Sequence, residues 1–292
     1  MNIQEGNIGI IKLNEVDLGL GGGSLTQVAN RSWVQGMSYI IETPAGETII
    51  IDGGYLEDAD FLYEEIKRRG GRVHAWFLTH PHVDHVGVLT QMLQDHPQLD
   101  IQIDGFYFHF PEKEWIFQKP GAANNERFFA ALSKHDLPIF TPNAGDVIPF
   151  GGLSVEIVHH PVEYRDYPHL NPTSMIMRIH FPKRDVLILG DFDVNSQGEF
   201  LKLRDVSKLR CDIVQMAHHG EDGIDRDFYA LIAPKVCLYP TTVGGRNCPN
   251  EKADAYKAAG EISSALYDVW QWMEELGATA SYSYDQGDWK FI

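Results

Sequence analysis

The sequence predicts an α/β fold in which sheets pack face to face and helices cover their outer sides. Two observations support this prediction. Apolar runs of strand length dominate the first half of the chain, and strand-like runs alternate with helical patterns in the second half. The chain has 292 residues, of which 43% are hydrophobic, so it can bury a sizeable core. We therefore expect one domain that spans residues 1–292.

The first predicted elements are a hairpin and a helix. Met37 to Glu42 and Glu47 to Asp52 are apolar runs of strand length, and a Pro-Ala-Gly turn signal separates them. Asp58 is a suitable N-cap for the helix that follows, and Gly70-Gly71 ends this helix. The next apolar run, Val73 to Leu78, predicts a buried strand.

A cluster of candidate metal ligands comes directly after this buried strand. It reads His80-x-His82-x-Asp84-His85. One catalytic metal usually takes three protein ligands and keeps a position open for water, so four donors favour two ions. His80 and His82 are two apart in an extended segment and can point to one ion, while Asp84 and His85 can point to a second.

The remaining elements follow from the spacing of apolar residues between turn signals. Short apolar runs predict strands at residues 101–110, 137–140, 153–158, 175–181, 185–189, 213–217, 235–239, 278–284 and 289–292. Apolar residues three and four apart predict helices at residues 86–93, 124–134, 198–203, 226–232 and 253–276. The ligand cluster therefore lies at a junction between a strand and a helix.

Two later strand ends carry further candidate ligands. Asp191 follows the strand predicted at 185–189, and Gly190 before it permits a close approach. Because two neighbouring metals need a bridging anion, we assign this role to the Asp191 carboxylate. His218 and His219 follow the strand at 213–217. We expect one of them to complete the second metal and the other to hydrogen-bond the substrate or leaving group.

The spacing His80-x-His82-x-Asp84-His85 resembles the signature of the metallo-β-lactamase superfamily. This resemblance implies a four-layer αββα sandwich that carries a dinuclear hydrolase centre. It favours His219 as the ligand, because the corresponding histidine often directly precedes a glycine, and it leaves His218 for the substrate. It also implies that Asp52 supports the site without binding metal.

The same resemblance implies one more histidine at the first metal, shortly before the segment that contains Ser174. The matching register falls on Leu170. His169 directly precedes Leu170, and His160 follows an earlier strand, so these two are equal candidates. His159 ranks below them.

A narrower resemblance covers nearly the whole chain. It is to the hydrolase domain of the competence protein ComEC and its relatives, which include a choline-binding teichoic-acid phosphorylcholine esterase. It rests on four motifs, namely Asn171-x-x-Ser174, Leu189-Gly190-Asp191, His218-His219-Gly220 and Asp285-Gln286-Gly287. The chain differs in having no membrane channel segments and in the stretch from Gly244 to Asn250. DNA is therefore not the expected substrate.

These features imply a metal-dependent hydrolase that attacks a phosphoester or phosphodiester with a metal-bound hydroxide. Zn²⁺ is the expected metal, with Mn²⁺ or Fe²⁺ as alternatives. Asp84 is expected to orient the hydroxide as well as to bind metal. Two other functions remain open: hydrolysis of a carbon ester, lactone, thioester or lactam at the same site, and metal binding without hydrolysis.

The overall composition limits the range of partners. A formal net charge of −17 repels polyanions, so we expect a small-molecule or phosphoester substrate and no long nucleic acid. Neither a signal peptide nor an apolar run of membrane-spanning length is evident, so we expect a cytoplasmic protein without membrane insertion. Cys211, Cys237 and Cys248 lack metal-type spacing and are expected to be packing residues. The sequence does not define an oligomeric state.

Overall fold

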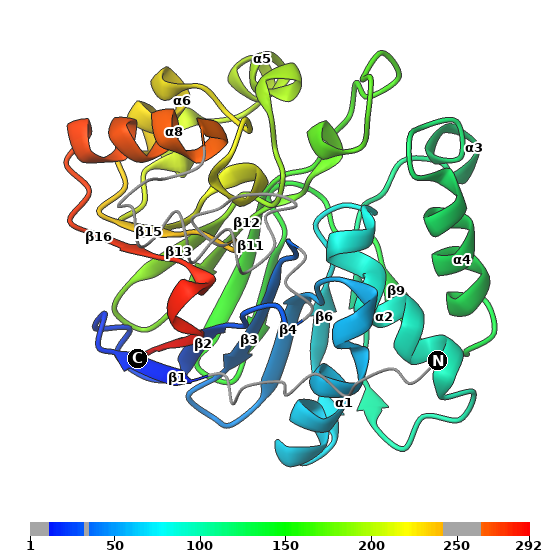
Figure 1. Cartoon of the computed structure of the whole chain (residues 1–292). Helices are drawn as coiled ribbons and strands as arrows, with labels where there is room; N and C mark the ends of the chain where they lie inside the picture. Colours follow the sequence, from blue (N-terminus) through cyan, green and yellow to red (C-terminus); the bar gives the residue numbers. More distant parts are fainter. Residues whose placement is uncertain (1–11, 32–34, 242–263) are drawn as a thin grey trace, which may run out of the picture.

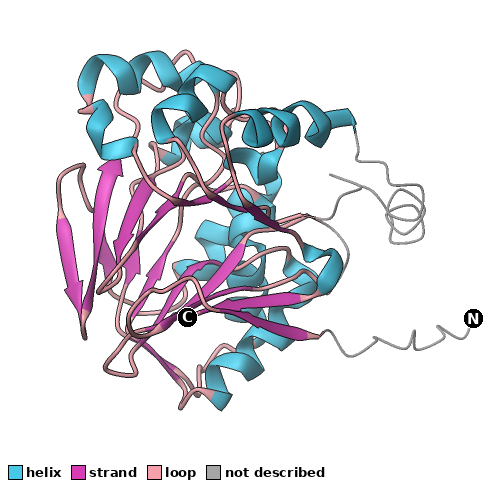
Figure 2. Cartoon of the chain, turned by 90° about the vertical axis from the view of Figure 1, so that its left-hand side faces the viewer, coloured by secondary structure: helices cyan, strands magenta, loops and turns pink. Residues whose placement is uncertain are grey.

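The computed structural model describes residues 12–31, 35–241 and 264–292. Two large β-sheets pack face to face, and helices cover their outer sides (Figures 1 and 2). The predicted α/β fold and its four-layer αββα arrangement are confirmed. The stretch from Gly244 to Asn250, Cys248, and the first part of the helix predicted at 253–276 lie outside the described residues.

The first sheet has eight strands in the order β1-β17-β2-β3-β4-β6-β8-β9. Its central hairpin is the predicted one, because β3 (Ser38–Glu42) and β4 (Thr48–Asp52) pair antiparallel. Strand β6 (Ala75–Phe77) pairs parallel with β4, so both strands end at the same edge of the sheet. The other strands are β1 (Leu13–Val16), β2 (Ser24–Gln27), β8 (Phe106–Tyr107), β9 (Ile139–Phe140) and β17 (Asp288–Phe291).

The second sheet has seven strands in the order β10-β11-β12-β13-β14-β15-β16. Strands β12 (Ile176–His180) and β13 (Asp185–Ile188) form the predicted second hairpin. From β13 onward the neighbours are parallel, so β13 and β14 (Ile213–Gln215) also end at one edge. The others are β10 (Val147–Phe150), β11 (Leu153–His159), β15 (Val236–Leu238) and β16 (Ala280–Tyr282).

The alternation of side chains along the strands builds two separate cores around the first sheet. Ile41 and Ile51 point between the sheets, where they pack with Met177 and Ile188 of the second sheet. On the other face, Ile40 and Ile50 pack with residues of the helices. A third core lies between the second sheet and its own helices. These three apolar layers account for the four-layer sandwich.

The helices lie on the outer faces of the sandwich (Figure 1). Helices α1 (Ala59–Arg68), α2 (Val83–Asp95) and α4 (Ala122–Leu132) contribute to the core on the first sheet, with α3 (Lys113–Ile116) nearby. Helices α5 (Val194–Leu203), α6 (Arg226–Ile232) and α8 (Ser264–Glu275) contribute to the core on the second sheet. Short 3-10 turns occur at Leu56–Asp58, Asn171–Thr173, Val206–Leu209, Ala217–Gly220 and Tyr284–Gln286.

Two local predictions need correction. The run at 101–110 is not one strand, because it divides into β7 (Gln102–Ile103), which pairs with β5 (Arg72–Val73), and β8. Asp58 does stand at the N-cap position of α1, but its carboxylate makes no capping hydrogen bond and accepts one from the backbone N–H of Arg31.

Candidate metal centre

Helix α2 positions the first group of candidate ligands. His80 and His82 lie in the extended segment between β6 and α2, and Asp84 and His85 lie in the first helical turn. Helix α2 lies close to the segment that follows β4. A Cβ on Gly87 would lie only 2.7 Å from the backbone nitrogen of Leu56, so only glycine fits there. This close contact places the start of α2 against the carboxyl edge of the first sheet.

Asp191 is held at the end of β13 by a set of buried hydrogen bonds. Its backbone N–H donates to Oγ of Ser174 at 3.0 Å. The side-chain oxygen of Gln215 accepts from the backbone N–H groups of Leu189 and Gly190, each at 2.8 Å. Gly190 has a φ of 58°, and a Cβ there would lie 2.9 Å from Cβ of Thr79, so glycine suits this crowded, left-handed position.

The backbone of the second histidine pair is left-handed. His218 has a φ of 49° and His219 a φ of 60°, which is unfavourable for residues with a Cβ. The backbone N–H of His218 donates to the carbonyl of Gly190 at 3.0 Å, and the preceding N–H, of Ala217, donates to the hydroxyl of Tyr229 at 3.1 Å. A strained backbone that its surroundings hold in place is typical of a functional site.

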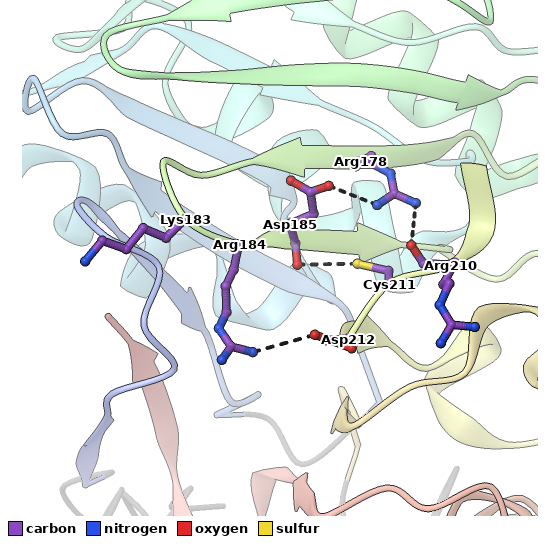
Figure 3. A pocket seen from close by; sticks show the side chains of 7 residues that line it. All are labelled: Arg178, Lys183, Arg184, Asp185, Arg210, Cys211 and Asp212. Atoms are coloured by element: carbon purple, nitrogen blue, oxygen red, sulfur yellow. Dashed lines mark hydrogen bonds and ion pairs between the residues drawn. The ribbon is translucent and has the colours of Figure 1, made fainter. Parts of the chain in front are cut away.

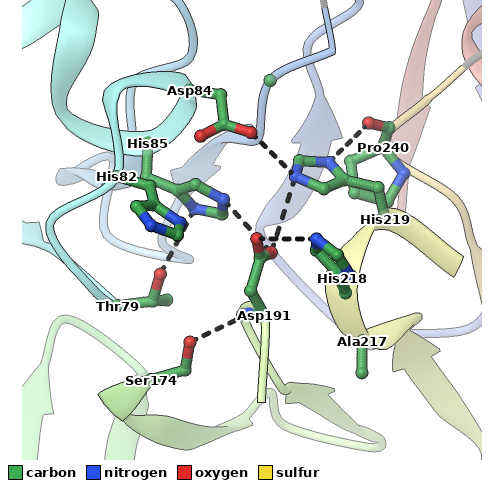
Figure 4. A network of polar contacts seen from close by, with 12 residues as sticks. Thr79, His82, Asp84, His85, Ser174, Asp191, Ala217, His218, His219 and Pro240 are labelled. Carbon is green, nitrogen blue, oxygen red and sulfur yellow. Dashed lines mark hydrogen bonds and ion pairs between the residues drawn. The ribbon is translucent and has the colours of Figure 1, made fainter. Parts of the chain in front are cut away.

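The structure brings seven of the predicted residues together in one place, and Figure 4 labels all of them except His80. Six of them form two groups of candidate ligands whose donor atoms lie within 4.8 Å of one another, and Asp191 belongs to both groups. We call Asp84, His85, Asp191 and His219 the inner group, and His80, His82 and Asp191 the outer group. The seventh residue, His218, lies beside them, with Nε2 3.9 Å from a carboxylate oxygen of Asp191.

The inner group has the geometry of a metal site. Nε2 of His85 lies 3.1 Å and Nε2 of His219 lies 3.5 Å from Oδ1 of Asp191, and Nε2 of His219 lies 3.4 Å from a carboxylate oxygen of Asp84. Donors at tetrahedral corners, with bonds of about 2.0–2.2 Å to zinc, are separated by about 3.3–3.6 Å.

Three donor atoms of the inner group are also buried without a hydrogen-bond partner: Nε2 of His85, Nε2 of His219 and Oδ1 of Asp191. Buried polar atoms are normally paired, because leaving one unpaired costs about 1–3 kcal/mol. A divalent metal ion would satisfy all three atoms together. The imidazole and carboxylate donors of the inner group therefore fit a divalent metal ion such as Zn²⁺.

The ionisation of these groups is shifted by burial and by their mutual contacts. Burial alone would raise the pKa of Asp191, but the neighbouring imidazoles of His85, His219 and His80 hold this pKa well below its usual value. Burial lowers the pKa of His80 well below its usual value and that of His82 to about 4. These two imidazoles are therefore neutral at pH 7, as metal binding requires.

His85 behaves differently from His80 and His82. Burial alone would lower its pKa, but the carboxylates of Asp191 and Asp52 raise this pKa well above the usual value. Its Nδ1 lies 2.7 Å from Oδ2 of Asp52, which also accepts a hydrogen bond from the Thr79 hydroxyl. Such a contact fixes the ring so that Nε2 faces the inner group. This arrangement agrees with the supporting role predicted for Asp52.

The three candidates for one more ligand of the first metal lie outside both groups. Nδ1 of His159 accepts a hydrogen bond from Arg204. Nδ1 of His160 accepts from the backbone N–H of Ala144, and its ring stacks on His109 with centroids 4.0 Å apart. Nε2 of His169 lies 3.5 Å from a carboxylate oxygen of Asp193. The structure brings none of these three histidines into either group of candidate ligands.

Some residues that hold the site were not identified from the sequence. Gln215, Tyr229 and Pro240 all support ligands or their backbone, and the carbonyl of Pro240 lies 2.9 Å from Nδ1 of His219. Ser174 belongs to one of the recognised motifs, but its motif gives no sign of the hydrogen bond that its hydroxyl accepts from the backbone of Asp191. These residues act through contacts between distant segments, for which one sequence gives no spacing signal.

A polar pocket of about 500 Å³ lies away from the metal groups, at the turn between β12 and β13 (Figure 3). This turn is at the end of β13 opposite to Asp191. Arg178 forms an ion pair with Asp185, and Arg184 lies 3.7 Å from Asp212. The pocket is lined by Arg178, Lys183, Arg184, Asp185, Arg210, Cys211 and Asp212. It contains none of the candidate ligands.

Comparisons with known proteins agree with this fold and site. The model of the metallo-β-lactamase superfamily matches residues 31–226, and the chain therefore belongs to this superfamily. No curated protein shows a significant match. Members of this superfamily are generally metallohydrolases, and the two groups of histidines and aspartates define a candidate dinuclear metal site in this chain.

Two solved structures illustrate the likeness in fold. The metallo-β-lactamase fold protein YhfI from Bacillus subtilis is 12% identical, with a TM-score of 0.54, and the alignment covers 91% of this chain and 99% of YhfI. CmlA, a diiron β-hydroxylase from Streptomyces venezuelae, is 14% identical with a TM-score of 0.55, and the alignment covers 89% of this chain and 52% of CmlA. At these identities the likeness concerns the fold alone. In the described part of the chain, no helix is long and apolar enough to cross a membrane.

Proposed function

We propose that this protein is a dinuclear metal-dependent hydrolase of a small phosphoester or phosphodiester. The observation that carries the proposal is the position of Asp191 in both the inner and the outer group. A carboxylate shared by two groups of ligands is the arrangement that holds two metal ions a few ångströms apart. When bound, two divalent ions supply an activated water and a Lewis acid for the substrate oxygen.

The charge of the site suits an anionic substrate. Two divalent ions would carry four positive charges against the two carboxylates of Asp84 and Asp191, so a net positive charge would remain. A phosphoester oxygen is attracted to such a site. The net charge of −17 for the whole chain repels long polyanions, which favours a small substrate. The resemblance of the motifs to the ComEC-like group supports the same substrate class.

His218 is the residue that we propose to contact the substrate. Nε2 of its ring faces Asp191 at 3.9 Å, and Nδ1 lies 2.8 Å from a carboxylate oxygen of Asp222. Hydrogen bonding to a carboxylate at Nδ1 orients an imidazole and fixes which nitrogen faces the reacting groups. From this position His218 can hydrogen-bond a substrate oxygen or the leaving group.

The first experiment is to measure the metal content of the purified protein together with hydrolysis of bis(p-nitrophenyl) phosphate, before and after chelation. Two ions per chain and a turnover that chelation removes and Zn²⁺ or Mn²⁺ restores would support the proposal. Two ions without phosphoester turnover would contradict the substrate class. Parallel assays with a thioester, a lactone and a lactam would then test the carbon-ester alternative.

A further inference from the structure

We propose that the two metal positions are unequal, so that the inner group fills first and tightly while the outer group binds a weaker, exchangeable ion. This inference rests on the proposed dinuclear site and concerns its two halves. Three independent features of the described residues distinguish the inner group from the outer group. The first is whether the donor atoms already have hydrogen-bond partners. The second is whether the other ring nitrogen of each histidine is held by a hydrogen bond, and the third is the number of ligands.

The donor atoms of the two groups differ in their present partners. In the inner group, Nε2 of His85, Nε2 of His219 and Oδ1 of Asp191 are buried and make no well-aligned hydrogen bond, although the two nitrogens lie 3.1 and 3.5 Å from this oxygen. In the outer group, Nε2 of His80 and Nδ1 of His82 lie 3.0 Å apart and hydrogen-bond each other. An ion that enters the inner group satisfies unpaired atoms, whereas an ion that enters the outer group must first break this hydrogen bond.

The two groups also differ in the hydrogen bonds that hold the histidine nitrogens facing away from the metal. His85 is held by the carboxylate of Asp52 at 2.7 Å, and His219 by the carbonyl of Pro240 at 2.9 Å. Such partners fix the ring of a metal-binding histidine and raise its basicity. The corresponding nitrogen of His80 has the hydroxyl of Thr79 at 3.3 Å, and His82 has no carboxylate or carbonyl partner among the described residues. Loss of such a supporting partner typically reduces metal affinity by about 10–100-fold.

The number of ligands points the same way. The inner group offers four side chains and the outer group three, with Asp191 common to both. Each histidine that would complete the outer group has another contact through one of its ring nitrogens. Arg204 donates to His159, the backbone of Ala144 donates to His160, and His169 faces Asp193. An ion in the outer group therefore keeps more open positions, which is the condition for exchange and for binding a substrate oxygen.

The expected result is two-step metal binding. With Zn²⁺ as the probe, the first ion should bind at least about tenfold more tightly than the second, because His85 and His219 have a carboxylate or carbonyl partner that His80 and His82 lack. Native mass spectrometry at limiting Zn²⁺ should then show a predominant species with one ion. Competition with a chromophoric chelator should give two separate dissociation constants.

Two variants assign the two steps. His82→Ala removes a half-buried ligand of the outer group and should abolish the second step, while the first dissociation constant stays within about threefold. His219→Ala removes a ligand of the inner group and should abolish the tight step. Asp84→Asn is the second inner-group variant, in case His219→Ala fails to fold by circular dichroism. It should weaken the first step while the fold is kept.

Each outcome supports or overturns the proposal. Two equal or cooperative steps in the parent protein would overturn the order of filling and leave the dinuclear hydrolase intact. Loss of the tight step in His82→Ala would assign the tight ion to the outer group and would also overturn it. Absence of any bound Zn²⁺ in the folded parent would contradict the proposed function together with this inference.

Discussion

Oδ2 of Asp52 lies 2.7 Å from Nδ1 of His85, although 33 residues separate them along the chain. The contact joins the end of β4 to the first turn of α2. The two carboxylate oxygens of Asp52 also accept hydrogen bonds from the backbone N–H and the hydroxyl of Thr79, each at 2.7 Å. Asp52 thus ties together the two segments that carry His80 and His85. It determines which nitrogen of His85 faces the inner group.

Replacing Asp52 by Asn should weaken metal binding without removing a ligand. Asp52 has a φ of 53°, a conformation that asparagine tolerates well, so the backbone should be retained. The amide cannot match the carboxylate as an acceptor for His85 and Thr79. We expect Zn²⁺ affinity to fall by about 10–100-fold in a chelator competition assay.

Asp288→Asn provides the matched control for Asp52→Asn. Asp288 is also a buried carboxylate that accepts a backbone N–H, from Ala29 at 2.7 Å, and it forms an ion pair with Arg31. It is not part of either ligand group. Its replacement should lower the thermal midpoint and leave Zn²⁺ affinity unchanged. An equal loss of affinity in both variants would show that general destabilisation, not the contact with His85, controls metal binding.

Asp191→Ala should remove metal binding and hydrolysis together. Asp191 is the only residue common to the inner and outer groups found among the described residues, so each group loses a ligand. We expect fewer than two ions per chain by elemental analysis and a loss of turnover of several orders of magnitude. Retention of two tightly bound ions in this variant would contradict the bridging role. Ser174→Ala, which removes the hydrogen bond to the backbone of Asp191, should have a milder effect on both measurements.

The sequence predicted the strand ends of the site well, because each ligand follows an apolar run. His80, Asp191 and His219 come after β6, β13 and β14, which were all recognisable from composition. Parallel neighbours end at the same edge, and this geometry brings the ligands together. Local spacing was thus sufficient to identify six candidate ligands that the structure places in two groups.

The orientation of His159 and His160 could not be predicted in the same way. Both come at the end of β11, and from spacing alone either could have faced the metals. The register of β11 against β12 shifts between Ile157 and His159, which changes the direction of the side chains that follow. His159 then packs against Phe192 and Phe200, and His160 stacks on His109. Such contacts depend on tertiary packing between distant segments.

Gly220→Ala should disturb the left-handed segment that carries the second histidine pair. Gly220 has a φ of 89°, and an added Cβ would overlap the ring of Tyr239. The variant combines a strained backbone with overpacking, so we expect a loss of about 2–4 kcal/mol in the free energy of unfolding and weaker Zn²⁺ binding. Urea denaturation and chelator competition measure the two effects.

Gly198→Ala tests whether the effect at Gly220 is specific to its conformation. Gly198 lies inside α5, and an added Cβ there would meet no atom within 4 Å. Alanine is favoured over glycine in a helix interior by about 0.5–1 kcal/mol, so this variant should be slightly stabilised. If both glycine variants lost the same stability, the argument from the backbone of Gly220 would fail.

Burial of His159 should make the stability of the protein depend on pH in the acidic range. Its side chain is fully buried, and burial, followed by the charge of Arg204 and by His160, lowers its pKa to about 3. An unfolded histidine has a pKa of about 6.5. Between these two values the unfolded chain binds a proton that the folded chain does not, so stability is full above pH 6.5 and falls as the pH drops toward 3.

His159→Gln isolates this contribution. A glutamine does not titrate, and its amide oxygen can still accept the hydrogen bond that Arg204 donates to Nδ1 of His159. One pKa unit corresponds to about 1.4 kcal/mol, so between pH 7.5 and 4.5 the parent should lose about 2–3 kcal/mol more than the variant. Urea denaturation of the metal-free proteins across this range measures the difference, because all other titrating groups are shared. Parallel curves for parent and variant would show that His159 titrates alike in the folded and unfolded chains, and that its packing against Phe192 and Phe200 does not exclude the proton.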